Sequence, residues 1–146
     1  MLRDRSLIPL SRQHQHGLAL CVMTERALRE DASARNIAKL SGKAIDHYDL
    51  ELTNHFEMEE QIVFPAISAH PLVPDLLAQH RRLEAMIAAL RAEPSSEQLL
   101  EFVALLRSHI RLEENELFQD IQTTLPRETL DSIGKQIDGK VVRICL

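Results

Sequence analysis

The chain has 146 residues, of which 45% are apolar and 27% charged, a balance typical of a globular domain with a hydrophobic core. The formal net charge is −5 and Lys and Arg form no cluster, so the sequence lacks the basic surface typical of nucleic-acid binding. No apolar run reaches the length of a membrane span, and the first residues lack the apolar core of a secretory signal. We therefore expect no membrane contact and a cytoplasmic location.

Leu, Ala, Glu, Arg and Gln dominate the composition, and these residues favour helices. The first helix is expected to begin after Pro9, with Ser11 as its N-cap, and to end near Glu30. The second is expected over about residues 34–64, where Pro65 kinks or ends it.

Three further helices complete the pattern. The third is expected to end near Ala92, and Ser96 is expected to cap a fourth helix over about residues 97–122. A short fifth helix is expected over about residues 127–138, where Gly139 ends it.

Short connections between long amphipathic helices favour antiparallel neighbours. No segment alternates with the period of two that a half-buried strand shows. We therefore predict an all-α fold: an up-down-up-down four-helix bundle over about residues 10–122, followed by the short C-terminal helix. The whole chain, residues 1–146, is expected to form one domain.

Two of the expected helices place polar side chains on the stripe that should face the core. In the fourth helix this stripe consists of Leu99, Phe102, Leu106, His109, Glu113 and Leu117. In the second helix it consists of Tyr48, Leu52, His55, Glu59 and Ile62. Burying an unpaired carboxylate is strongly unfavourable, so we expect a positive charge beside each of these glutamates.

The two stripes belong to an internal repeat. Residues 55–64 align without gaps with residues 109–118, and His, Glu, Glu and Phe coincide at the same offsets. Each His-x-x-x-Glu pair places its two side chains one turn apart on the same helix face. Such a pair can also be an ordinary surface ion pair, but here both pairs lie on apolar stripes, which favours a buried site.

The other two long helices each add a histidine, in the matching dipeptides Gln13-His14 and Gln79-His80. Both histidines lie on apolar faces of their helices. On the first helix His16 is the alternative, because it points nearly opposite to His14 and shares its own face with apolar residues.

Imidazole and carboxylate groups together suit iron, zinc, nickel or copper. The four helices supply six candidate ligands: His14, His55, Glu59, His80, His109 and Glu113. Two carboxylates able to bridge and four imidazoles fit two metal ions better than one, and the core of a helical bundle is a usual place for such a site. Glu114 is the alternative to Glu113, although successive helical residues point about 100° apart.

These residues resemble the hemerythrin-like family, also called the HHE cation-binding domain, over about residues 7–122. The resemblance depends on Leu10-Ser11-Arg12-Gln13-His14, His55-x-x-x-Glu59-Glu60 with Phe64-Pro65, Gln79-His80, and His109-Ile110-Arg111-Leu112-Glu113-Glu114 with Leu117-Phe118. It implies a left-handed four-helix bundle around an oxo- or hydroxo-bridged di-iron centre. Glu59 and Glu113 would then be the bridging carboxylates, with the histidines as terminal ligands.

The chain departs from the respiratory hemerythrins at two positions. Glu84 stands where they have a second histidine on the third helix, and their spacing of the last carboxylate would select Glu114 instead of Glu113. The resemblance is therefore closer to relatives that sense or process oxygen, nitric oxide or peroxide, or that supply iron for iron–sulfur cluster repair.

We expect a protein with two iron ions (Fe²⁺/Fe³⁺) that binds or senses a small diatomic molecule or peroxide, or that holds iron. The alternative is a di-iron enzyme for peroxide or nitric oxide turnover or for iron–sulfur cluster repair, with Glu84 or Glu25 as a candidate titratable group. The ligand set also accommodates zinc or manganese. A purely structural role for the metals is disfavoured, because a bundle of this size does not need a metal to fold.

Overall fold

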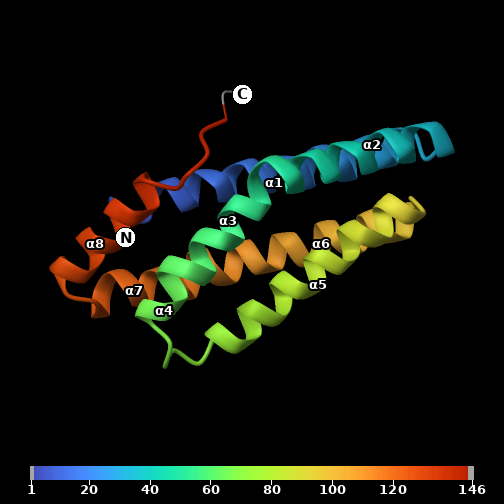
Figure 1. Ribbon diagram of the computed structural model, residues 1–146. Helices are drawn as coiled ribbons and strands as arrows, with labels where there is room; N and C mark the ends of the chain where they lie inside the picture. The colour runs from blue at the N-terminus through green and yellow to red at the C-terminus, as the bar shows by residue number, and fades with distance from the viewer. Residues whose placement is uncertain (1, 145–146) are drawn as a thin grey trace.

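A computed structural model describes residues 2–144, which form four long helical rods and a short fifth helix (Figure 1). The first rod is α1 (Ile8–Glu30) and the third is α5 (Val73–Ala92). The second rod runs without a break through α2 (Ala34–His47), η1 (Tyr48–Leu52), α3 (Thr53–Met58), η2 (Glu59–Val63) and α4 (Phe64–Ala66). The fourth rod and the last helix comprise α6 (Ser96–Leu112), η3 (Glu113–Leu117), α7 (Phe118–Thr124) and α8 (Arg127–Asp138). The described residues contain no strand, so the predicted all-α fold is confirmed.

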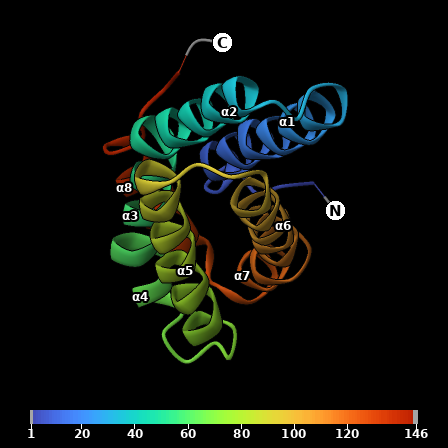
Figure 2. The same ribbon diagram turned by 90° about the vertical axis from the view of Figure 1, so that its right-hand side faces the viewer.

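The rods pack side by side as a four-helix bundle. α1 contacts α2 and α6, and α5 contacts the same two helices, so successive rods are neighbours and the last closes against the first. Figure 2 shows this ring from one end. The arrangement is the up-down-up-down bundle expected from the short connections. α8 lies at one end of the bundle, where its apolar residues Leu130, Ile133 and Ile137 are buried.

Three segments of the rods are π-helical: η1, η2 and η3. A π-helical turn contains one residue more than an α-helical turn and is often found at functional sites. Figure 1 shows the second rod changing direction between α2 and α3, where η1 lies. The extra residue of a π turn is a known cause of such a bend.

Two predicted helix caps are wrong. α1 begins at Ile8, so Ser11 lies inside the helix, and its hydroxyl donates a hydrogen bond to the Glu114 carboxylate at 2.7 Å. The N-cap of α6 is Ser95, one residue before the predicted Ser96. Ser95 has extended backbone, and its hydroxyl oxygen accepts a hydrogen bond from the Gln98 backbone N–H at 3.1 Å, which is the usual N-cap geometry.

Replacing Ser95 with alanine is expected to lower the free energy of unfolding by about 1 kcal/mol, because one N–H group of the first turn loses its partner. Ser96→Ala is the matched control, since Ser96 makes no capping bond among the described residues, and it should have a much smaller effect. Chemical denaturation of both variants measures the difference. Equal losses would contradict the assignment of the cap.

The apolar core is divided into two clusters by a layer of polar side chains. One cluster lies at the end that carries α8 and includes Leu10, Leu76 and Leu117. The other lies toward the opposite end and includes Leu83 and Phe102. The polar residues buried between the two clusters are His14, His55, Glu59, His80, His109 and Glu113. Because buried polar groups are costly unless they have partners, this layer marks the candidate functional site.

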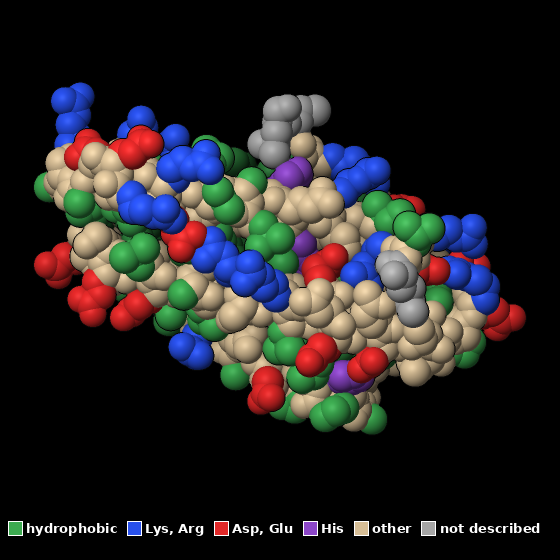
Figure 3. Space-filling model, turned by 180° about the vertical axis from the view of Figure 1, so that it is seen from behind, with side chains coloured by type: hydrophobic (Ala, Val, Ile, Leu, Met, Phe, Trp, Pro, Cys, Tyr) green, Lys and Arg blue, Asp and Glu red, His purple; other side chains and the backbone are tan. Residues whose placement is uncertain are grey.

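The surface gives little sign of this layer. The face shown in Figure 3 mixes basic and acidic side chains, with little histidine. The four histidines of the layer are 3% exposed or less. Within residues 2–144 no helix combines the length and the apolar composition that crossing a membrane requires.

Candidate metal centre

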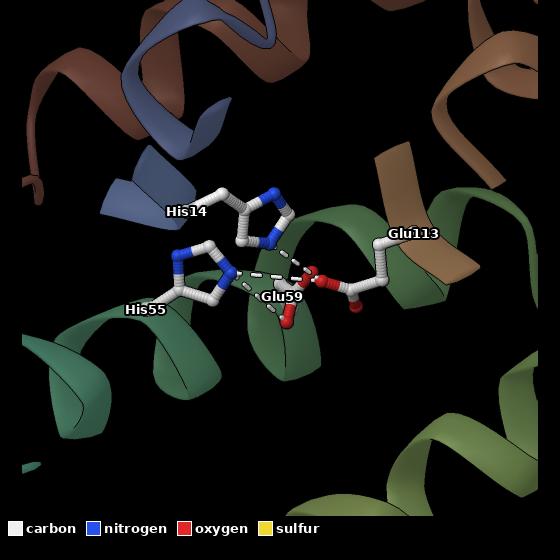
Figure 4. Close-up of side chains that lie close together, drawn as sticks. All are labelled: His14, His55, Glu59 and Glu113. Atoms are coloured by element: carbon white, nitrogen blue, oxygen red, sulfur yellow. Dashed lines mark hydrogen bonds and ion pairs between the residues drawn. The ribbon is translucent and has the colours of Figure 1, made fainter. Parts of the chain in front are cut away.

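The structure brings together all six residues that the sequence nominated. Their ligand atoms form two groups, in each of which the atoms lie within 4.8 Å of one another. The first group, called here the His14–His55 half-site, contains His14, His55, Glu59 and Glu113 (Figure 4). The second, the His80–His109 half-site, contains Glu59, His80, His109 and Glu113. Both glutamates belong to both half-sites, whereas each histidine belongs to one.

The nearest contacts within the centre join imidazole Nε2 atoms to carboxylate oxygens. His14 Nε2 lies 2.8 Å from Glu113 Oε1, and His80 Nε2 lies 3.1 Å from Glu59 Oε1. The two pairs within one helix are looser, at 3.4 Å for His55 and Glu59 and 3.4 Å for His109 and Glu113. Each of the four rods therefore directs an Nε2 atom toward the two carboxylates.

The two carboxylates occupy equivalent places in the backbone. Glu59 is the first residue of η2 and Glu113 is the first residue of η3. The backbone N–H of Phe64 donates to the carbonyl of Glu59, and that of Phe118 donates to Glu113, each five residues back. The repeat seen in the sequence therefore also repeats the change from α- to π-helix at the same offset.

Two histidines are oriented by carboxylates from a neighbouring rod. His14 Nδ1 lies 2.8 Å from Glu114 Oε2, and His80 Nδ1 lies 2.8 Å from Glu60 Oε2. Glu60 and Glu114 each follow a carboxylate of the centre in the sequence, so one helix turn supplies both the inner carboxylate and the group that orients a histidine. Glu114, the alternative to Glu113 in the sequence, lies in this outer position.

The other two histidines are oriented by glutamine side chains. His55 Nδ1 donates to Gln13 Oε1 at 2.8 Å, and His109 Nδ1 donates to Gln79 Oε1 at 2.6 Å. An amide oxygen only accepts hydrogen bonds, so Nδ1 carries a proton, and in the neutral imidazole the lone pair of Nε2 is free to bind a metal ion. Such a bond fixes the ring orientation and the tautomer of a metal-binding histidine.

Several buried atoms of the centre have no hydrogen-bond partner within the described residues. They are Nε2 of His55 and His109, and Oε2 of Glu59 and Glu113. Unpartnered buried polar atoms are rare. Each of these four is a nitrogen or oxygen atom whose lone pair can bind a metal ion. The residues therefore fit a metal centre.

When no metal ion is bound, protonated histidines balance the negative charge of the two buried carboxylates. Burial by itself would lower the pKa of His14, but its bonds to Glu113 and Glu114 outweigh burial and raise the pKa to about 9. Burial opposes ionisation of Glu59, yet the neighbouring histidines hold its pKa well below the usual range. Burial lowers the pKa of His109 to about 4, so this imidazole is neutral. The metal-free pocket thus holds buried negative charge that attracts protons.

Aromatic rings cover the imidazoles. Phe56 stacks on His80 with ring centroids 3.9 Å apart, and Phe118 stacks on His14 at 5.4 Å. Phe64 lies on His80 as well, at 5.7 Å. These rings exclude water from the centre and thereby strengthen its electrostatic interactions.

Other polar residues named in the sequence lie outside the centre. His16 contacts the buried carboxylate of Glu51 at 2.8 Å, so it is His14, and not His16, that the structure places among the six residues. Glu84 forms an ion pair with Arg81 at 3.0 Å. Tyr48 and Glu84 line a surface pocket of about 290 Å³ that also reaches Phe56 and Glu60 beside the centre.

Sequence reasoning missed the roles of Gln13, Glu60, Gln79 and Glu114. The sequence contains a signal for them, because both dipeptides recur: Gln-His at residues 13–14, 15–16 and 79–80, and Glu-Glu at residues 59–60 and 113–114. Their side chains act across rods, however, so their partners become evident only in the folded bundle.

The bundle and its buried histidine–carboxylate layer define a class of proteins that bind metal ions between four helices. The sequence model of the hemerythrin HHE cation-binding domain family matches residues 9–121, so the chain belongs to this family. Comparisons with curated proteins and with solved structures gave no significant match.

Proposed function

We propose that the chain is a non-haem di-iron protein whose centre binds or senses a small diatomic molecule, such as oxygen or nitric oxide, or peroxide, and holds iron between such events. The observation that carries this proposal is the pair of half-sites that share Glu59 and Glu113. Each half-site contains two imidazole nitrogens and one oxygen from each of the two shared carboxylates. This donor set suits iron.

The six proposed ligands are His14, His55, Glu59, His80, His109 and Glu113. Glu59 and Glu113 would bridge the two ions, and the histidines would bind one ion each through Nε2. Bound iron would supply redox chemistry and an open coordination position for a small ligand. The chain's own residues orient the imidazoles through their Nδ1 atoms and exclude water with the phenylalanine rings.

The arrangement of titratable groups favours binding over turnover. Glu60 and Glu114, which contact histidines of the centre, are both engaged in orienting these histidines. An enzyme that moves protons to a substrate benefits from a free acid or base close to the metals. In residues 2–144 the two candidates named from the sequence are instead paired with arginines, Glu84 with Arg81 and Glu25 with Arg107.

Metal analysis tests the proposal. Chain loaded anaerobically with Fe²⁺ should contain about two irons per molecule, as in other di-iron bundles, and its visible spectrum should change reversibly on exposure to oxygen or nitric oxide. The double variant His55→Ala/His109→Ala, which removes one histidine from each half-site, should lose this iron. Folded wild-type protein that takes up no iron would overturn the proposal. Sustained consumption of peroxide would support the enzyme instead of the binding protein.

A further inference from the structure

The C-terminal segment after α8 is fastened to the second rod by one side chain. The side-chain nitrogen Nδ2 of Asn54 donates to the Lys140 backbone carbonyl at 2.9 Å. The side-chain oxygen Oδ1 of Asn54 accepts from the Val142 backbone N–H at 3.0 Å. Asn54 thus pairs with an extended stretch of backbone through both ends of its amide. Figure 1 shows this segment leaving the end of α8 and passing beside α1.

The same asparagine also holds a residue that orients the metal centre. Gln13 Nε2 donates to Asn54 Oδ1 at 3.1 Å and lies 3.5 Å from the Val142 carbonyl oxygen. At its other end, Gln13 Oε1 accepts the bond from His55 Nδ1. Because Gln13 is 4% exposed and bonded at both ends, it cannot rotate without losing several hydrogen bonds.

The other half-site lacks this support. Gln79 holds His109 as Gln13 holds His55, but within residues 2–144 the Gln79 amide nitrogen has no hydrogen-bond partner. The residue before His109 is Ser108, the counterpart of Asn54 in the internal repeat. Ser108 is exposed, and its hydroxyl donates to the Leu105 carbonyl of its own helix. The two halves of the centre are therefore alike in their inner residues and different in what holds them.

We propose that the C-terminal segment Lys140–Val142 locks the His14–His55 half-site through Asn54 and Gln13, so that this half-site releases its metal ion more slowly than the His80–His109 half-site. The inference rests on the proposed two-metal centre. For an ion to leave, the imidazole that binds it must turn away, and the chain from Val142 to His55 opposes this rotation. Removing a residue that orients a metal-binding histidine costs about 10- to 100-fold in metal affinity.

Metal release from the intact chain tests this. The protein is loaded with Co²⁺, a strong chelator is added, and the visible absorption of bound Co²⁺ is followed with time. The wild type should release its ions in a fast and a slow phase. Asn54→Ala should accelerate the slow phase, by at most the roughly 10- to 100-fold that losing the orienting residue itself costs in affinity, and leave the fast phase unchanged. Ser108→Ala, at the matching position of the repeat, should change neither phase.

A second pair of variants acts on the C-terminal segment itself. Val142→Pro removes the backbone N–H that donates to Asn54, whereas Val142→Ala keeps it. Val142 is 44% exposed, so neither change disturbs the core. Only the proline variant should accelerate the slow phase.

The outcomes separate this inference from the proposed function. If the wild type binds two Co²⁺ ions and releases both at one rate, or if Asn54→Ala and Val142→Pro leave the slow phase unchanged, the lock is wrong and the two-metal centre stands. If the wild type binds no Co²⁺ and no Fe²⁺, both are wrong.

Discussion

Glu59→Gln or Glu113→Gln is expected to abolish tight binding of both metal ions, whereas His80→Ala is expected to leave about one ion per chain. The reason is the sharing of ligands: each glutamate belongs to both half-sites, and each histidine to one. Glutamine preserves the size of the side chain but removes the negative charge and one of the two oxygens needed to bridge. Metal content after gel filtration of the Fe²⁺-loaded variants measures the stoichiometry.

Glu116→Gln is the matched control for these variants. Glu116 lies on the same π-helical segment as Glu113 but is exposed, so its replacement should leave both ions in place. A Glu113→Gln chain that kept one ion with undiminished affinity would contradict a bridging role for Glu113. A His80→Ala chain that lost both ions would show instead that the two half-sites bind their ions cooperatively.

The metal-free protein is expected to be most stable near pH 6.5 and to lose about 3 kcal/mol on the alkaline side, between pH 6.5 and 9. The pKa of His14 rises from 6.5 to about 9 on folding, so the stabilisation is fully present below pH 6.5 and disappears as the pH rises through 9. On the acid side, the pKa of His109 falls to about 4. Its neutral form therefore stabilises the fold above pH 6.5, and this contribution disappears as the pH falls toward 4.

Denaturant unfolding of chelator-treated protein across this pH range measures the effect. His14→Gln should remove the contribution of His14 to the alkaline loss, because no proton is then bound at this position, and leave the part that comes from His55 and His80, whose pKa values their contacts with Glu59 also raise. Metal-loaded protein should lack the same loss, since the ions replace the protons that neutralise the two carboxylates. Identical pH dependence in the metal-free and the metal-loaded protein would contradict this account.

The positions of the six central residues could be predicted from the sequence because the helical spacing of three or four residues places them on the same helix faces as the apolar core residues. His55 and Glu59 lie on the stripe that must face the core, and the repeat places His109 and Glu113 in the same way. Periodicity favoured His14 over His16 only weakly, since both share a face with apolar residues. The packing of α1 against its neighbours directs His14 inward.

The π-helical segments could not be predicted from the same pattern. A π-helical turn adds one residue at a single place and shifts the apolar stripe around the helix there. On both sides of this place the apolar residues still recur at steps of three or four, so the spacing does not reveal the extra residue. The Ser95 cap was missed for a related reason: Ser95 and Ser96 are chemically identical, and only the extended backbone of Ser95 decides between them. The partners of Gln13 and Gln79 depend on contacts between rods, which no local pattern contains.

The division of the apolar core into two clusters has a consequence for the folding cooperativity of the chain. Each cluster is continuous within itself, and the histidine–carboxylate layer is the boundary between them. Parts of a protein that share few apolar contacts open as separate units in hydrogen exchange. With metal bound, the ions tie all four rods together at this boundary, and the bundle is expected to open as one unit. Without metal, the amides at the two ends are expected to exchange with separate free energies, so the ions act as the coupling between two folding units.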